Sequence, residues 1–153
     1  MNSLANTVTM RRRHERAKGS SRKNAANGNG APHIKLFADG ADKRAMLELY
    51  ADPRVQGFTT NPTLMRKAGV DDYSAFAHEI LQIIRDRPIS FEVFADDFQE
   101  MEQQALEIAS WAENVFVKVP VTNAQGKPSD NLICRLAKAG VKLNVTALMT
   151  LDQ

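Results

Sequence analysis

Short apolar segments alternate with helical patterns from His33 onward, and this alternation constrains the fold more than any other feature of the sequence. In the intervals between the apolar segments, apolar residues recur at spacings of three and four, as on one face of a helix. Strands that alternate with helices in this way are typical of βα units built around a parallel sheet. The sequence therefore predicts an α/β fold with strands near residues 34–38, 57–60, 89–95, 115–121 and 141–147.

Helices are predicted between these strands. The clearest amphipathic pattern lies between Asp97 and Glu113, and further helices are expected after Asp42, near residues 73–85, and after Ser129 or Asp130. The spacing permits either a five-stranded doubly wound sheet or part of an eight-stranded barrel. Neither G-x-G-x-x-G after the first strand nor G-x-x-x-x-G-K-[ST] occurs, which argues against a nucleotide-binding fold.

The first 31 residues differ in composition from the rest of the chain. They hold seven Arg or Lys against one acid and almost no large apolar residue, so we expect a disordered basic segment at 1–31 and one domain at 32–153. A basic arm for RNA or anionic surfaces and an organelle transit peptide are functional interpretations of this segment. A solvated tail, or a start codon assigned too early, is favoured because no aromatic or amphipathic pattern accompanies the charge.

The body of the chain is mildly acidic, because 13 Lys or Arg and 17 Asp or Glu remain after the basic segment is set aside. No nucleic-acid partner is therefore expected. No apolar run approaches the roughly 18 residues that span a bilayer, so no membrane association is expected either. The single cysteine, Cys134, excludes an internal disulfide and suits a reducing compartment, which makes the cytoplasm the expected location.

Polar side chains stand in or at the end of every predicted strand, although a parallel strand buried on both faces would be almost purely apolar. The carboxyl ends of parallel strands meet at one mouth in either candidate fold. We therefore expect these residues to converge; they are Asp39, Thr59, Thr60, Asn61, Glu92, Lys118, Asn144 and Thr146.

Lys118 is the most informative of these residues, because its neighbours Phe116, Val117, Val119 and Pro120 are apolar. An ammonium is costly to desolvate, and a neutral amine is a nucleophile toward carbonyls. The alternative is a lysine that reaches solvent or pairs with a nearby acid, and the residues of its own strand do not decide between the two.

The other polar residues also have two interpretations each. Asp39 and Glu92 could divide the acid and base tasks of carbon–carbon cleavage, or could simply pair with Lys118 or cap a helix. Asn61 and Asn144 could donate to substrate hydroxyls, although Asn61 precedes a proline and could mark an ordinary loop. Thr146 could hold a water molecule or act only as a β-branched strand former. No metal site is expected, because His78 has no second histidine at ligand spacing.

Five motifs follow one another in the predicted strands: Leu-Phe-Ala-Asp39, Thr59-Thr60-Asn61-Pro62, Phe91-Glu92-Val93, Val117-Lys118-Val119-Pro120-Val121-Thr122 and Leu143-Asn144-Val145-Thr146. In this order they resemble the transaldolase and fructose-6-phosphate aldolase family over about residues 34–151. The resemblance implies a (βα)8 TIM barrel of the class I aldolase type, which needs neither cofactor nor metal.

The resemblance also implies a role for each residue. Lys118 matches the lysine that forms a Schiff base with a ketose, and Asp39 matches the acid–base group of C3–C4 cleavage. Glu92 and Thr146 match the pair that holds the proton-shuttling water. Asn61 and Asn144 match the asparagines that contact the dihydroxyacetone unit, and Thr60 is placed with them as substrate-binding.

Glu92 together with Asn144-x-Thr146 is more similar to the transaldolase branch than to the aldolase branch. The resemblance therefore implies transfer of a dihydroxyacetone unit between sugar phosphates, in the pentose phosphate pathway of carbohydrate metabolism.

Members of that family continue through strands six to eight, which supply a serine and the phosphate-binding arginines. The barrel is therefore expected to be truncated after its fifth strand, with open edges that natural proteins avoid. This predicts a chain that is unstable or inactive alone. The alternatives are a catalytically inactive fragment that acts as a binding or assembly module, a homo-oligomer, and a split protein completed by a complementing fragment.

Overall fold

Five parallel strands form one sheet in the computed structural model, which describes residues 34–153. The predicted basic segment at 1–31 lies outside the described residues. The sheet order is the chain order, and each strand pairs in parallel with the next. The strands are β1 (Leu36–Asp39), β2 (Val55–Thr59), β3 (Ile89–Glu92), β4 (Val115–Pro120) and β5 (Leu143–Thr146).

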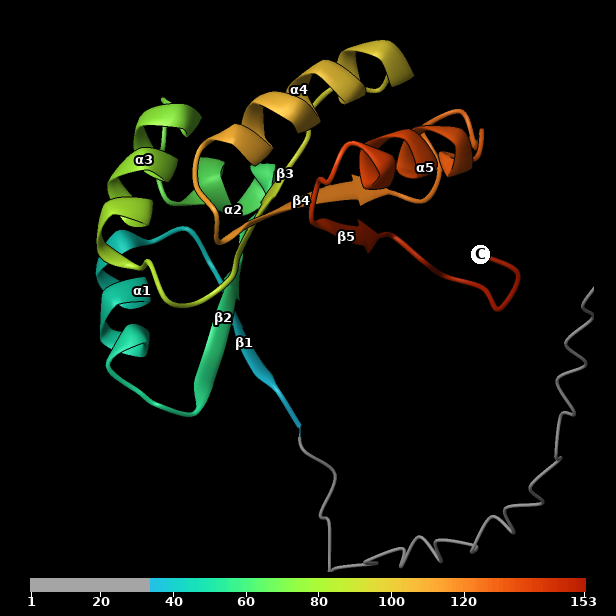
Figure 1. Cartoon of the computed structure of the whole chain (residues 1–153). Coiled ribbons are helices and arrows are strands. Elements are labelled where there is room, and N and C mark those ends of the chain that lie inside the picture. The colour runs from blue at the N-terminus through green and yellow to red at the C-terminus, as the bar shows by residue number, and fades with distance from the viewer. Residues whose placement is uncertain (1–33) are drawn as a thin grey trace, which may run out of the picture. The chain divides into compact units, whose positions relative to one another are not determined.

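This order decides between the two predicted folds. A doubly wound sheet reverses its winding, so its strand order departs from chain order, whereas a barrel adds each strand beside the last. Figure 1 shows the sheet curving around an open concave side, with α1, α3, α4 and α5 on its convex side. The prediction of a partial TIM barrel is confirmed. Its helices are α1 (Lys43–Tyr50), α2 (Pro62–Lys67), α3 (Tyr73–Ile83), α4 (Phe98–Ser110) and α5 (Asp130–Lys138).

Aspartates begin three of these helices. The side chain of Asp42 accepts a hydrogen bond from Ala45 N, and Asp72 and Asp97 cap α3 and α4 in the same way. Each carboxylate satisfies a backbone N–H that has no partner within the helix. Helix α5 was expected to begin at Ser129 or Asp130, and Ser129 is the residue that precedes it. Its side chain makes no capping bond, however, and its Oγ is buried without a partner.

Helix α2 was not predicted. Asn61 and Pro62, which the sequence also allowed as loop residues, instead start it: Asn61 accepts from Leu64 N at 2.9 Å, and Pro62 is the first helical residue. Proline suits this position because its missing N–H would have no intrahelical partner there.

Strand β3 ends three residues earlier than predicted. The backbone N–H groups of Phe94 and Ala95 donate to Gln104 Oε1 of α4, at 2.8 and 3.0 Å, instead of to a neighbouring strand. A side chain on the following helix therefore terminates the strand at Glu92. The apolar run from Phe91 to Ala95 gave no sign of this bond.

The core lies between the sheet and its helices. In β4 the side chains alternate: Val115, Val117 and Val119 are buried, and the intervening residues are partly exposed. Because successive strand residues point to opposite faces, Lys118 lies on the concave face opposite the valines. The most deeply buried side chains include Phe58, Ile80, Ile89, Phe91, Met101, Val117 and Leu136.

Both outer strands have an open edge within residues 34–153, since β1 pairs there only with β2 and β5 only with β4. Large apolar side chains are exposed at and beside these strands: Ile34, Leu36 and Phe37 near β1, and Leu148, Met149 and Leu151 after β5. In this part of the chain no helix is long and apolar enough to cross a membrane.

Candidate active site

Lys118 is the centre of a polar row on the concave face. The register aligns Glu92 of β3, Lys118 of β4 and Asn144 of β5. Lys118 Nζ lies 3.2 Å from Glu92 Oε2 and donates to the Thr60 carbonyl at 3.0 Å. The side chain of Lys118 is 12% exposed and that of Glu92 is 21% exposed. The amine is therefore held by a carboxylate and a carbonyl in a largely dry setting.

The Thr60 carbonyl is one of the two groups that hold this amine. Thr60 is buried, and its backbone N and its Oγ1 both donate to the Ser90 carbonyl, at 3.0 and 3.1 Å. The hydroxyl predicted to bind substrate thus bonds within the sheet, and the Thr60 carbonyl is the group that meets Lys118.

Ser90 extends the polar row and was not predicted. It is buried on β3, and its Oγ accepts a hydrogen bond from Asn144 Nδ2 at 3.2 Å. This bond links β5 to β3 across β4. The sequence carried a signal for Ser90, because a polar residue two positions before Glu92 in a strand lies on the same face.

The remaining predicted residues have separate partners. Asp39, at the end of β1, accepts from Thr59 Oγ1 at 2.8 Å and makes no bond to Lys118. The Asn61 side chain caps α2, as described above. Thr146 is paired with Pro120 in the β4–β5 register, and its carbonyl accepts from Val121 N at 2.9 Å. The structure thus joins Lys118 to Glu92 and Thr60 directly, and Asn144 to the same row through Ser90.

Tyr73, the first residue of α3, is the second group that the sequence did not indicate. Its hydroxyl accepts from Glu92 N at 2.8 Å and donates to the Glu92 carbonyl at 3.1 Å. The ring packs edge-to-face on Phe91, Phe94 and Trp111. Burial raises the pKa of Tyr73 above its ordinary value. No local pattern marked this tyrosine, because the contact joins the start of a helix to the end of a strand.

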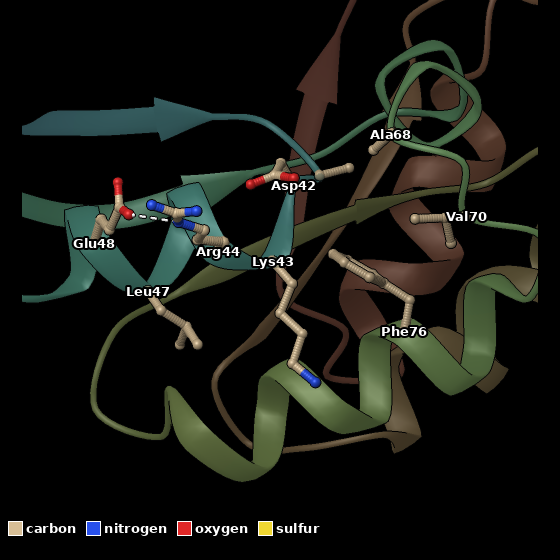
Figure 2. A pocket seen from close by; sticks show the side chains of 9 residues that line it. Asp42, Lys43, Arg44, Leu47, Glu48, Ala68, Val70 and Phe76 are labelled. Atoms are coloured by element: carbon tan, nitrogen blue, oxygen red, sulfur yellow. Dashed lines mark hydrogen bonds and ion pairs between the residues drawn. The ribbon is translucent and has the colours of Figure 1, made fainter.

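A cavity of about 730 Å³ is lined by residues of α1 and α3 and of the segments beside them (Figure 2). Its charged groups already have partners: Lys43 pairs with Glu79 at 2.6 Å, Arg44 pairs with Glu48 at 3.0 Å, and Asp42 caps α1. None of the predicted site residues lines it. The lining residues are Ala41, Asp42, Lys43, Arg44, Leu47, Glu48, Ala68, Val70 and Phe76.

The concave row combines the groups needed for imine chemistry. An amine can attack a carbonyl carbon, and a carboxylate beside it can accept or return protons. An amide such as that of Asn144 can donate to a substrate hydroxyl. Within residues 34–153 no group of three or more His, Cys, Asp or Glu side chains is placed to hold a metal ion.

Comparison with known proteins gives a consistent result. The profile of the Transaldolase/Fructose-6-phosphate aldolase family matches residues 36–153. A probable transaldolase of Dehalococcoides mccartyi is 42% identical over 120 residues, which are 78% of this chain and 54% of that protein. Probable transaldolases of Methanococcus maripaludis and Streptococcus agalactiae are 40% and 39% identical, again over 78% of this chain and 53% of theirs.

The chain thus spans about half the length of the curated relatives that it matches. The family profile covers every described strand and helix, including the polar row around Lys118. On these grounds the chain belongs to the Transaldolase/Fructose-6-phosphate aldolase family.

Proposed function

We propose that this chain carries the imine-forming part of a transaldolase-type site, in which Lys118 bonds to the carbonyl carbon of a ketose phosphate. The observation that carries the proposal is the setting of the amine: Lys118 Nζ is within 3.2 Å of Glu92 Oε2 and 3.0 Å of the Thr60 carbonyl. Both contacts hold the amine on the concave side of the sheet, where we propose that the substrate binds.

The proposed reaction starts with attack of the neutral Lys118 amine on the ketose carbonyl. Loss of water then gives an iminium ion, which accepts the electron pair released when the C3–C4 bond breaks. Asp39 takes the proton of the C4 hydroxyl as the aldose phosphate departs, and the resulting enamine attacks the aldehyde of an acceptor aldose phosphate. Hydrolysis of the second imine frees the amine, so atoms and electrons balance without a redox partner.

The other site residues have supporting roles in this proposal. Glu92 and Thr146 hold the water that is lost and regained, and Glu92 is already beside the amine. Asn144 and Asn61 face the dihydroxyacetone unit, and Thr60 contributes to the site through its carbonyl, which holds the amine. For Asn61 the free donor is the amide nitrogen, because its Oδ1 accepts from Leu64 N.

Borohydride reduction in the presence of fructose 6-phosphate tests this proposal. Reduction fixes an imine as a secondary amine, so the expected product is a mass adduct on the peptide that contains Lys118. The Lys118→Arg variant keeps the positive charge but cannot form the adduct. Equal labelling of the variant and the unaltered chain would overturn the proposal.

The open edges of the sheet support a second candidate, assembly with a complementing polypeptide. The edges of β1 and β5 present unpaired backbone groups and exposed apolar side chains, as described above. Strands with such edges pair readily with other chains. A homo-oligomer or a polypeptide carrying further βα units would cover them, with or without catalysis by the assembly.

Sedimentation at several concentrations, with and without a polypeptide carrying the last three βα units of a relative, separates these states. Formation of a discrete complex supports completion by a further fragment. A chain that stays monomeric at all concentrations and does not bind the added polypeptide would exclude assembly.

We also propose a cytoplasmic location, which the free thiol of Cys134 supports because such thiols persist in reducing compartments.

A further inference from the structure

The hydrogen-bond ladder between β2 and β3 ends at Thr60, the residue whose carbonyl contacts the Lys118 amine. Phe58 N donates to the Pro88 carbonyl at 2.9 Å, and Thr60 N donates to the Ser90 carbonyl at 3.0 Å. In a continuing parallel ladder, the next bond would run from Glu92 N to the Thr60 carbonyl. The pairing of the two strands ends at Thr59 and Ser90, and Glu92 N and the Thr60 carbonyl do not bond to each other.

Both halves of the missing bond have other partners. Glu92 N donates to the Tyr73 hydroxyl at 2.8 Å, and the Thr60 carbonyl accepts from Lys118 Nζ at 3.0 Å. The Glu92 N–H is thus paired with a tyrosine hydroxyl, and the Thr60 carbonyl is paired with the candidate nucleophile. Buried backbone groups are costly to leave unpaired, and each of these two groups is paired with a side chain in place of the other strand.

We propose that Tyr73 is a positioning residue whose hydroxyl holds the β2–β3 ladder open at Glu92 and so frees the Thr60 carbonyl to hold the Lys118 amine. Its importance for catalysis rests on the function proposed above. The aromatic contacts with Phe91, Phe94 and Trp111 fix the ring at the end of β3, and Asp72 fixes the start of its helix.

Tyr73→Phe keeps the ring and removes only the hydroxyl. We expect Glu92 N then to donate to the Thr60 carbonyl, as in a continuing ladder, and this new bond to weaken the bond from that carbonyl to the amine. The amine then loses one of the two contacts that hold it and is freer to reach a reagent.

The test is acetylation of the full chain with a small amine-reactive ester at fixed pH, followed by peptide mass spectrometry. The readout is the labelling of Lys118 divided by that of Lys142, which contacts the Glu113 carbonyl at another place on the molecule. We expect this ratio to rise several-fold in Tyr73→Phe. Tyr50→Phe is the matched control, because the Tyr50 hydroxyl bonds to Asp86 on the surface, and it should leave the ratio unchanged.

A folded Tyr73→Phe chain with an unchanged ratio would overturn the proposal, even if its melting temperature fell, because a merely structural tyrosine affects stability alone. If this variant does not fold, nuclear Overhauser contacts in the unaltered chain decide. A contact between the Tyr73 ring-edge protons and the Glu92 amide proton is expected; its absence would overturn the proposal.

The acetylation ratio does not require imine formation, so the two proposals fail separately. If the Lys118/Lys142 labelling ratio rises in Tyr73→Phe but borohydride traps no adduct on Lys118, the proposed function is wrong and the role of Tyr73 stands. An adduct on Lys118 with an unchanged ratio would overturn the role of Tyr73 alone.

Discussion

The Lys118 ammonium and the Glu92 carboxylate form the one ion pair within residues 34–153 in which both side chains are mostly buried. A buried charge that loses its partner keeps its desolvation cost and loses the attraction that offset it. The pair therefore couples the stability of the sheet to the groups of the candidate site.

Glu92→Gln tests this coupling, because glutamine keeps the shape and one acceptor but removes the charge. We expect the free energy of unfolding to fall by about 1.5–3 kcal/mol, the range for hydrogen bonds to charged groups. Urea unfolding measures it. Glu102→Gln is the control, since Glu102 pairs with Arg135 at 2.7 Å on the exposed helical side and surface pairs contribute little. Equal losses in the two variants would contradict the account.

The buried Tyr73 hydroxyl predicts a loss of stability at alkaline pH. Burial raises the pKa of Tyr73 above its ordinary value of 10.0, so the folded state holds the proton more tightly than the unfolded state. This contribution is fully present below pH 10 and is lost as the pH rises from there toward the folded-state pKa.

The unaltered chain should therefore lose its stability advantage over Tyr73→Phe above that pH. Melting temperatures of both chains between pH 8 and 11 measure the difference. A difference that stays constant across the range would contradict the burial of this hydroxyl.

At this scale the sequence predicted the identity of the polar residues better than their contacts. Lys118, Glu92 and Asn144 could be found because polar residues stand out in apolar strands. Their partners could not: the Thr60 carbonyl belongs to the backbone, and Tyr73 reaches Glu92 from a helix 19 positions earlier in the chain. Local patterns contain neither relation.

Among the elements, the helix starts offer the sharpest contrast. Asp97 caps α4 by accepting from both Gln99 N and Glu100 N, whereas Ser129 precedes α5 without any capping bond. Residue type alone does not separate the two, because Asp and Ser are both good capping residues.

Asp97→Ala should therefore lower the free energy of unfolding by about 1 kcal/mol, the usual value of an N-cap. Ser129→Ala should be neutral or stabilising, because it removes a buried hydroxyl that has no partner. Chemical denaturation of both variants gives the comparison. A larger loss in Ser129→Ala than in Asp97→Ala would contradict the described helix start.

Element order was predictable because the period of the apolar residues switches between two and about 3.6 along the chain. The residues at which elements begin and end were less predictable. Strand β3 stops at Glu92 because Gln104 takes the next backbone donors, and α2 exists because Asn61 and Pro62 start a helix where a loop was equally plausible. Both outcomes depend on partners that the strand or turn does not itself contain.

At the level of the whole sheet, the open edges of β1 and β5 are where we expect association with another chain. Phe37 on the edge strand β1 and Leu106 on α4 are both 46% exposed, but only Phe37 adjoins unpaired backbone groups. A charge on an edge strand opposes pairing with another chain.

Phe37→Lys should therefore reduce concentration-dependent association, and Leu106→Lys should leave it almost unchanged. Sedimentation velocity over a concentration series measures both. If association falls equally in the two variants, it results from non-specific hydrophobic contacts and not from pairing at the edge strand.

We propose Lys118 as the imine-forming residue, and site-resolved trapping with dihydroxyacetone tests this role most directly. This ketone carries no phosphate, so its capture depends only on the concave row of polar residues. After borohydride reduction we expect the adduct to concentrate on Lys118, with little on Lys142, and the yield to saturate with ketone concentration. An adduct spread evenly over both lysines, rising linearly with concentration, would contradict the account.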